Sequence, residues 1–286
     1  MKFLDKTILI LRQLLIYLFF RKKIYNNVFY DLEINLFQIF SFKKIPSIII
    51  FTIPKSGSQS VAYTLIDILK LSRKTVSSEL HWSIDKISLS KINKIKKYNH
   101  LVFDHIPFSK DVCEVLSKHE AFDKLVVHIR DPRNALISWI NWVQHEIKRN
   151  HFDEKSKFYL KLHPRPKMSI FKDNDSKQIK DYFIKNYYPQ FVSWIEKWDT
   201  FASENSLKKK ILFVKYENFC KDPLNYLNKI FTFYDIKDID LPKRFKNKFF
   251  IHKITNKTSN YMNYFSEQEK VKLYEKSKYI LDKYYK

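Results

Sequence analysis

The sequence predicts an α/β fold in which a parallel sheet is flanked by helices. Short apolar runs recur along the chain, and a segment with helical periodicity follows each of them sooner or later. That alternation favours parallel strands that are covered on both faces. The only glycine, Gly57, lies between the first run and the helical segment after it, which predicts a strand, a tight loop and a helix. The predicted strands span residues 47–53, 101–104, 124–130 and 211–215.

The predicted helices follow from the spacing of apolar residues and from residues that start helices. One of them contains Pro189, where we expect a kink or a break because proline removes a backbone donor. Another begins with a capping box from Ser266 to Glu269. A long polar stretch, residues 155–180, is a candidate loop or lid over a site. We expect helices over residues 58–70, 134–147 and 182–201, and from Asp222 and Ser266 onward.

The charge of the chain is strongly positive. Its 286 residues include 53 Lys and Arg against 30 Asp and Glu, a formal net charge of +23. Such a field favours phosphates, sulfated or acidic substrates, nucleic acid or an anionic membrane face. The lysines are scattered, however, so compositional drift explains much of the excess equally well. Cys113 and Cys220 form neither a disulfide framework nor a metal-ligand spacing, so we expect no metal and either a reducing compartment or a simple pair of buried thiols. A cytoplasmic location, with or without membrane association, agrees with both.

We divide the chain into an N-terminal appendage, residues 1–45, and one α/β domain, residues 46–286. Residues 8–20 are mostly apolar and are followed by three basic residues. The run is short for a membrane span, which needs about 20 apolar residues. Three interpretations remain open: an amphipathic helix packed on the domain, a helix in the membrane interface with peripheral contact through residues 8–23, and a signal anchor.

Basic residues follow three of the predicted strands. Lys55 lies in the loop after the first strand, His105 follows the second, and Arg130 ends the third. Each has an ordinary explanation by itself, as a solvated lysine, a core histidine or a surface ion pair. Open parallel sheets bind ligands beyond the carboxyl ends of their strands. Together with the loop at Gly57, whose N–H groups and helix start favour an anion, these residues predict a phosphate-binding edge.

Residues 52–60, TIPKSGSQS, resemble the 5′-phosphosulfate loop of sulfotransferases that use 3′-phosphoadenosine-5′-phosphosulfate (PAPS), whose usual form is T-Y-P-K-S-G-T-T. The resemblance extends over roughly residues 47–286, because further segments match in order and spacing. It implies a P-loop NTPase-like sulfotransferase fold with PAPS as the donor. It also implies that the donor is bound by Lys55, Ser56, Gly57, Ser58, Gln59 and Ser60.

Two further segments resemble functional motifs of this family. IRDPRNALISW, residues 129–139, is similar to the motif that holds the 3′-phosphate, here with Arg130 and Ser138. A guanidinium that binds two oxygens at once, with a hydroxyl beside it, suits that task. VKYENFCKDPLNYLNKI, residues 214–230, is similar to a packing segment of the family.

The resemblance also implies two catalytic residues. FDHIP, residues 103–107, is similar to the family segment that supplies the base, so His105 takes that role and Lys55 stabilises the leaving oxygen. If His105 is not the base, Asp104 or Glu79 is next in line. The reaction needs no metal. The acceptor is a hydroxyl of a small molecule or glycan, with a carbohydrate or glycolipid as the leading suggestion.

The sequence departs from the family pattern in three places. Ser60 replaces a tryptophan that stacks on adenine, and Phe103 replaces a lysine near the base. The closing R-K-G motif is reduced to ITNKTSNY, residues 254–261, and we assign its contact to neither of the nearby lysines, Lys253 and Lys257, which could replace only part of it.

Two other classes of function stay open. The first is a kinase-like nucleotide transferase, although Lys55 precedes the glycine rather than following it and only Asp104 offers a carboxylate for magnesium. The second is a basic nucleic-acid-binding protein, although no recognition motif or concentrated basic helix supports a nucleic-acid partner. The preference for adenosine 3′,5′-bisphosphate over ATP and over duplex DNA separates them.

Overall fold

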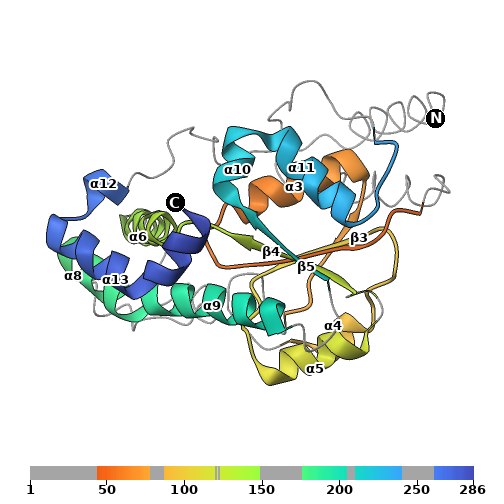
Figure 1. Ribbon diagram of the computed structural model, residues 1–286, viewed down its shortest axis with the longest axis horizontal. Coiled ribbons are helices and arrows are strands. Elements are labelled where there is room, and N and C mark those ends of the chain that lie inside the picture. Colours follow the sequence, from red (N-terminus) through yellow and green to blue (C-terminus); the bar gives the residue numbers. More distant parts are fainter. Residues whose placement is uncertain are drawn as a thin grey trace.

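The sheet is parallel and forms the middle layer of the domain. The computed structural model describes residues 44–77, 87–119, 121, 123–148, 176–204, 210–239 and 261–286. Within these ranges, five strands pair in the order β2-β3-β1-β4-β5 (Figure 1). This confirms the predicted fold class. The strands are β1 (Ile48–Thr52), β2 (Ser72–Lys74), β3 (His100–Asp104), β4 (Lys124–Ile129) and β5 (Lys210–Lys215).

Helices cover both faces of the sheet (Figure 1). Helices α3, α10 and α11 lie on one face, and α5, α6 and α9 lie on the other, with α8 and α13 packed around α9. The helices are α3 (Ser58–Leu69), α4 (Leu89–Ile92), α5 (Lys110–Lys118), α6 (Pro132–Lys148), α8 (Ser176–Asn186), α9 (Tyr188–Glu204), α10 (Tyr216–Lys221), α11 (Pro223–Phe233), α12 (Tyr261–Tyr264) and α13 (Glu267–Tyr284).

Strand β1 is the centre of the molecule and is buried along its whole length. Its side chains alternate between the two faces, as the period of a strand requires. Ile48 and Ile50 pack in the core beneath α3 and α11, whereas Ile49 and Phe51 pack in the core beneath α6 and α9. A run of isoleucine and phenylalanine therefore suits β1, because both of its faces are apolar.

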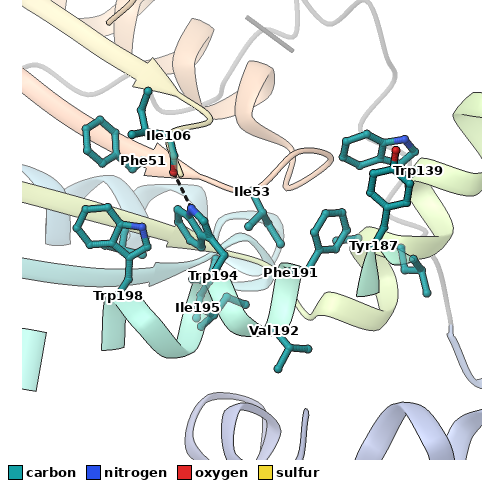
Figure 2. Packing of buried hydrophobic residues seen from close by; sticks show 14 of the residues in the cluster. Phe51, Ile53, Ile106, Trp139, Tyr187, Phe191, Val192, Trp194, Ile195 and Trp198 are labelled. Atoms are coloured by element: carbon teal, nitrogen blue, oxygen red, sulfur yellow. Dashed lines mark hydrogen bonds between the residues drawn. The ribbon is translucent and has the colours of Figure 1, made fainter. Parts of the chain in front are cut away.

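Aromatic side chains from α9 fix the segment that follows β3 (Figure 2). The indole Nε1 of Trp194 donates a hydrogen bond of 2.7 Å to the carbonyl of Ile106, the residue after His105. The ring of Trp198 lies 5.7 Å from that of Phe51, centroid to centroid. The core beneath α9 thereby holds the backbone next to His105 in place.

Several sequence predictions concern helix ends. The expected break near Pro189 occurs at Tyr187, between α8 and α9, and Pro189 is the second residue of α9, where its missing N–H costs little. The capping box is confirmed: Ser266 Oγ accepts from the N–H of Glu269, and Glu269 Oε2 accepts from the N–H of Ser266.

Five elements of the described ranges were not predicted: β2, α4, α5, α10 and α12. Strand β2 reads Ser-Arg-Lys and has no apolar pattern because it is an edge strand with half-buried side chains. Most of the suggested lid, residues 155–180, and the whole N-terminal segment, residues 8–23, lie outside the described residues. Within the described ranges, no helix has both the length and the apolar character needed to cross a membrane.

Candidate active site

The strand order brings three predicted site residues to one edge of the sheet. β1 pairs with β3 on one side and with β4 on the other. The three strands run parallel, so the segments after them leave from the same edge. Lys55, His105 and Arg130 follow β1, β3 and β4 respectively, and they therefore meet around the loop from Ile53 to Gly57.

The loop contains two residues in the left-handed backbone region. Gly57 has φ 74° and caps α3, and Lys55 has φ 64°. A lysine in that region costs roughly 1–2 kcal/mol, and such strain gathers at functional sites. Gly57 is constrained a second time, because an added Cβ would lie 2.5 Å from two ring carbons of Tyr216. The chain keeps its one glycine where both the dihedral angle and the neighbouring ring require it.

Three side chains from neighbouring strands hold the carbonyl groups of this segment. His105 Nδ1 lies 3.0 Å from the carbonyl oxygen of Thr52, Arg130 Nη1 donates to that of Lys55 at 2.7 Å, and His128 Nε2 lies 2.8 Å from that of Ser56. Two more carbonyls of this segment accept hydrogen bonds from nearby residues. The carbonyl of Ile53 accepts from the Ser56 hydroxyl, and that of Gly57 accepts from the Ser60 N–H.

This arrangement turns the N–H groups of the loop away from the sheet. In a trans peptide the C=O and N–H point in opposite directions, so a carbonyl held by the sheet implies an N–H that faces outward. The N-terminus of α3 adds its own N–H groups and the positive end of its dipole. Within the described part of the chain, no side-chain cap occupies this helix start. The geometry suits an anion.

The predicted loop residues contribute in different ways. Ser56 is fully buried and its hydroxyl donates to the carbonyl of Ile53 at 2.6 Å, so its side chain braces the loop. Ser58, Gln59 and Ser60 form the first turn of α3 and are partly exposed. The amide oxygen of Gln59 accepts a 2.9 Å hydrogen bond from Arg73. These residues are placed to act mainly through backbone N–H groups.

Lys55 brings its charge to the tip of the loop. Its Nζ lies 5.2 Å from the centre of the Trp142 ring, which belongs to α6. A cation over an indole face gains roughly 0.5–2 kcal/mol, depending on how far water is excluded. Trp142 therefore limits the directions that the ammonium group takes.

His105 is buried, with 8% of its surface exposed. A carbonyl oxygen only accepts hydrogen bonds, so Nδ1 carries the proton that points to the Thr52 carbonyl. In the neutral ring the lone pair is then on Nε2. A histidine oriented in this way by a backbone carbonyl is suited to accept a proton.

Arg130 is 6% exposed and lies at the end of β4, just before α6. Its guanidinium carbon is 5.0 Å from the centre of the Tyr216 ring. The neighbouring Asp131 forms an ion pair of 2.6 Å with Arg133. Ser138 is in the second turn of α6 and is partly exposed. Arg130 and Ser138 thus belong to one strand end and the helix that continues it.

The carboxylate of Asp104 is hydrogen-bonded to the segment that follows β2. It accepts hydrogen bonds from the Thr75 hydroxyl and from the N–H groups of Val76 and Ser77. These bonds fix the segment after β2, so the carboxylate that the sequence offered for magnesium is already engaged. In the described ranges, no group of three or more His, Cys, Asp or Glu is placed to hold a metal ion. Glu79, Lys253 and Lys257 lie outside the described residues.

Sequence reasoning missed two residues that contact the loop, His128 and Tyr216. His128 is the next-to-last residue of β4 and is fully buried, and Tyr216 begins α10 against Gly57. Burial, with Arg130 and His105 nearby, lowers the pKa of His128 to about 4, so the ring is neutral at pH 7. The only available signal was a histidine inside the apolar run KLVVHI, and that signal has no specific meaning by itself.

Comparison with known proteins identifies the family of this chain. The sequence matches the sulfotransferase domain family over residues 46–281, and the chain belongs to that family. It is therefore a transferase. No curated protein matches the sequence significantly.

Two solved structures are similar to this chain. One is the crystal structure of mouse sulfotransferase SULT7A1 complexed with PAP, with a TM-score of 0.52, 16% identity and coverage of 81% of this chain and 83% of that chain. The other is the sulfotransferase domain from the curacin biosynthetic pathway, with a TM-score of 0.36, 14% identity and coverage of 68% and 76%. The first similarity shows a shared fold, and we draw no conclusion from the second.

Proposed function

We propose that this transferase moves a sulfuryl group from PAPS to an acceptor hydroxyl. The observation that carries the proposal is the loop from Thr52 to Gly57. Its carbonyls are held by His105, Arg130 and His128, which turns its N–H groups toward the place where an anion would bind, and Lys55 adds a positive charge at the same loop. The 5′-phosphosulfate of the donor has the charge and shape for that place. Membership of the sulfotransferase family supports PAPS as the source of that anion.

Lys55 acts on the leaving group. As the acceptor oxygen bonds to sulfur, the bond from sulfur to the 5′-phosphate oxygen breaks and the electron pair stays on that oxygen. A cation beside this oxygen stabilises the transition state more than the ground state. The Trp142 ring and the strained backbone keep the ammonium group near the loop.

His105 takes the proton of the acceptor hydroxyl. The proton moves to Nε2, because Nδ1–H is bonded to the Thr52 carbonyl. The products are then the sulfated acceptor, adenosine 3′,5′-bisphosphate and an imidazolium that returns its proton to water. Arg130 and Ser138 are proposed to bind the 3′-phosphate. That role adds to the contact of Arg130 with the Lys55 carbonyl.

The acceptor is proposed to be a small molecule or glycan, with a carbohydrate or glycolipid hydroxyl first. The support is indirect: the net charge of +23 suits an acidic or membrane-linked acceptor. We also propose that residues 46–286 form the catalytic domain and that residues 8–23 of the appendage bring it to a membrane face in the cytoplasm. Loss of co-sedimentation with phosphatidylserine vesicles after Arg21, Lys22 and Lys23 are changed to Glu would support the contact; unchanged binding would contradict it.

The first test is the choice of nucleotide by the full-length chain. We expect calorimetry to give tighter binding of adenosine 3′,5′-bisphosphate than of ATP with magnesium or of duplex DNA at moderate salt. Tighter binding of ATP would favour the kinase-like alternative, and tighter binding of DNA the nucleic-acid alternative. Mass spectrometry with isotopically labelled donor and a panel of sugars, glycolipids and phenols then identifies the acceptor.

The second test uses site variants in the transfer assay. Lys55→Ala should lower turnover by on the order of a hundredfold or more with a smaller loss of donor affinity. His105→Ala and His105→Gln should both lower the rate by roughly 10²- to 10⁴-fold and leave nucleotide binding nearly intact. The exposed Lys118 on α5 provides the control Lys118→Ala. A folded Lys55→Ala protein with wild-type turnover would remove Lys55 from the mechanism.

Arg130→Ala tests the 3′-phosphate site. If Arg130 binds this group, affinity for adenosine 3′,5′-bisphosphate should fall by roughly 2–4 kcal/mol, and that for adenosine 5′-phosphate should fall clearly less, because only the contact with the Lys55 carbonyl is lost there. If Arg130 acts only by holding the Lys55 carbonyl, both ligands lose affinity equally.

A further inference from the structure

His128 is a polar residue in an apolar strand. It lies in β4 between Val127 and Ile129, and none of its surface is exposed. Aromatic rings surround it edge-on: the centroids of Phe103 and Tyr226 are each 5.9 Å from that of the imidazole. Burying an imidazole in such a place is unfavourable unless both nitrogens are hydrogen-bonded. The surroundings of position 128 favour an apolar side chain, so the histidine there requires an explanation.

Both nitrogens of His128 have partners, and the partners define the tautomer. Nε2 faces the carbonyl oxygen of Ser56 at 2.8 Å, so Nε2 carries the proton. Nδ1 lies 2.7 Å from the hydroxyl of Tyr226 and accepts from it. A chain of two hydrogen bonds therefore runs from α11 through β4 to the loop after β1.

The bond to Ser56 controls one N–H of the loop directly. The Ser56 carbonyl and the Gly57 N–H belong to the same planar peptide and point in opposite directions. When His128 holds the carbonyl toward the sheet, the Gly57 N–H is aimed away from the sheet, toward the start of α3. An apolar residue at position 128 would leave the carbonyl without this donor, and the peptide would be freer to rotate.

We propose that His128 is a positioning residue that sets the Ser56–Gly57 peptide for the 5′-phosphosulfate of the donor, and that Tyr226 fixes the tautomer that it needs. This inference rests on the proposed function. It concerns the 5′ end of the nucleotide alone. His128 touches the loop and not the donor, so its effect should be selective for ligands that carry a 5′-phosphate.

The test compares variants at these two positions with matched controls. His128→Phe removes both nitrogens, His128→Gln keeps a donor near Nε2, and Tyr226→Phe removes only the hydroxyl. His100 is another buried histidine, bonded to the backbone N–H of Lys96 at the opposite end of the sheet, so His100→Phe is one control. Tyr234 follows α11, and its buried hydroxyl bonds to the backbone of Ile49, so Tyr234→Phe is the other.

The measurement is calorimetric binding of adenosine 3′,5′-bisphosphate and of adenosine 3′-phosphate to the full-length variants. We expect His128→Phe to weaken the bisphosphate roughly tenfold and the 3′-phosphate less than about twofold. His128→Gln should restore most of the affinity for the bisphosphate that His128→Phe loses. Tyr226→Phe should give an affinity between those of the wild type and His128→Phe. Both controls should leave the ratio of the two affinities unchanged even where they lower stability.

The outcomes separate this inference from the proposed function. If the wild type does not bind the bisphosphate, the proposed function and this role fail together. If the wild type binds and His128→Phe weakens both ligands equally, or neither, only the positioning role is wrong. Long-range ¹H–¹⁵N spectra of the wild-type imidazole provide a test independent of ligands and of variant folding. We expect the neutral Nε2–H tautomer at pH 7, and the Nδ1–H tautomer would overturn the proposal.

Discussion

At the scale of single residues, Gly57 explains why a chain with one glycine places it after β1. Its φ of 74° favours glycine, because a Cβ is disfavoured in that region. The Tyr216 ring fills the space that a Cβ would need. Tyr216 also faces the Arg130 guanidinium, so the loop, the ring and the cation form one packed unit.

We expect Gly57→Ala to lower the free energy of unfolding by about 2–3 kcal/mol, from backbone strain and the clash with Tyr216. Binding of adenosine 3′,5′-bisphosphate should weaken as well. Urea unfolding and calorimetry measure the two effects. Tyr216→Ala in the same chain removes the clash but not the strain, so the double variant should lose less than the sum of the single variants. A Gly57→Ala protein as stable as the wild type would contradict both constraints.

At the scale of elements, a buried carboxylate joins the C-terminal helix α13 to α9. Asp199 on α9 is 3% exposed and accepts hydrogen bonds from Lys283, Tyr279 and Tyr284, all on α13. Burial alone would raise the pKa of Asp199, but these bonds outweigh it and the pKa is lowered. The carboxylate is thus ionised in the folded protein and fixes the rotation of α13 about its axis.

Asp199→Ala should lower the free energy of unfolding by about 3 kcal/mol, because it leaves two tyrosine hydroxyls and an ammonium group without their acceptor. The control is Asp282→Ala on the same helix, where a partly exposed carboxylate pairs with the exposed Lys286 and with the Tyr274 hydroxyl, and a smaller change is expected. Urea unfolding at pH 7 compares the two. Equal effects would mean that the Asp199 cluster contributes no more than a surface pair.

At the scale of the whole molecule, two buried histidines make the free energy of unfolding depend on pH. Burial lowers the pKa of His128 to about 4, with Arg130 and His105 adding to the shift. Burial, then Lys74 and Lys96, lower that of His100 to about 4. Both pKa values are below the unfolded value of about 6.5, so the unfolded chain binds more protons between these limits. Stability is therefore complete above pH 6.5 and is lost as the pH falls toward 4.

We expect the free energy of unfolding, measured with urea, to decline as the pH falls from 6.5 to 4. At pH 5, about 2 kcal/mol of this decline should be due to His128. His128→Gln should remove that share of the slope. His145→Gln is the control, because His145 is exposed on α6. A decline that is unchanged in His128→Gln would assign it to other groups.

The sequence predicted the central elements well because their signals are local. The apolar run of β1, the glycine after it and the spacing of α3 lie within about twenty consecutive residues, and each is a stretch whose pattern matches its structure. The capping box at Ser266 is local too. Strand β2 and helix α10 were missed, since their residues have no clear period and are held by contacts with distant segments.

The sequence by itself determined which residues stand at the strand ends: Lys55 with Gly57, His105 and Arg130. Only the tertiary structure decided that these residues meet and what else meets them. The order β3-β1-β4 places His105 beside Thr52 and Arg130 beside Lys55, contacts that span 53 and 75 residues of the chain. The bond from His128 to Ser56 spans 72. A local pattern predicts a strand but not its neighbour, because pairing depends on how both faces of the sheet are covered.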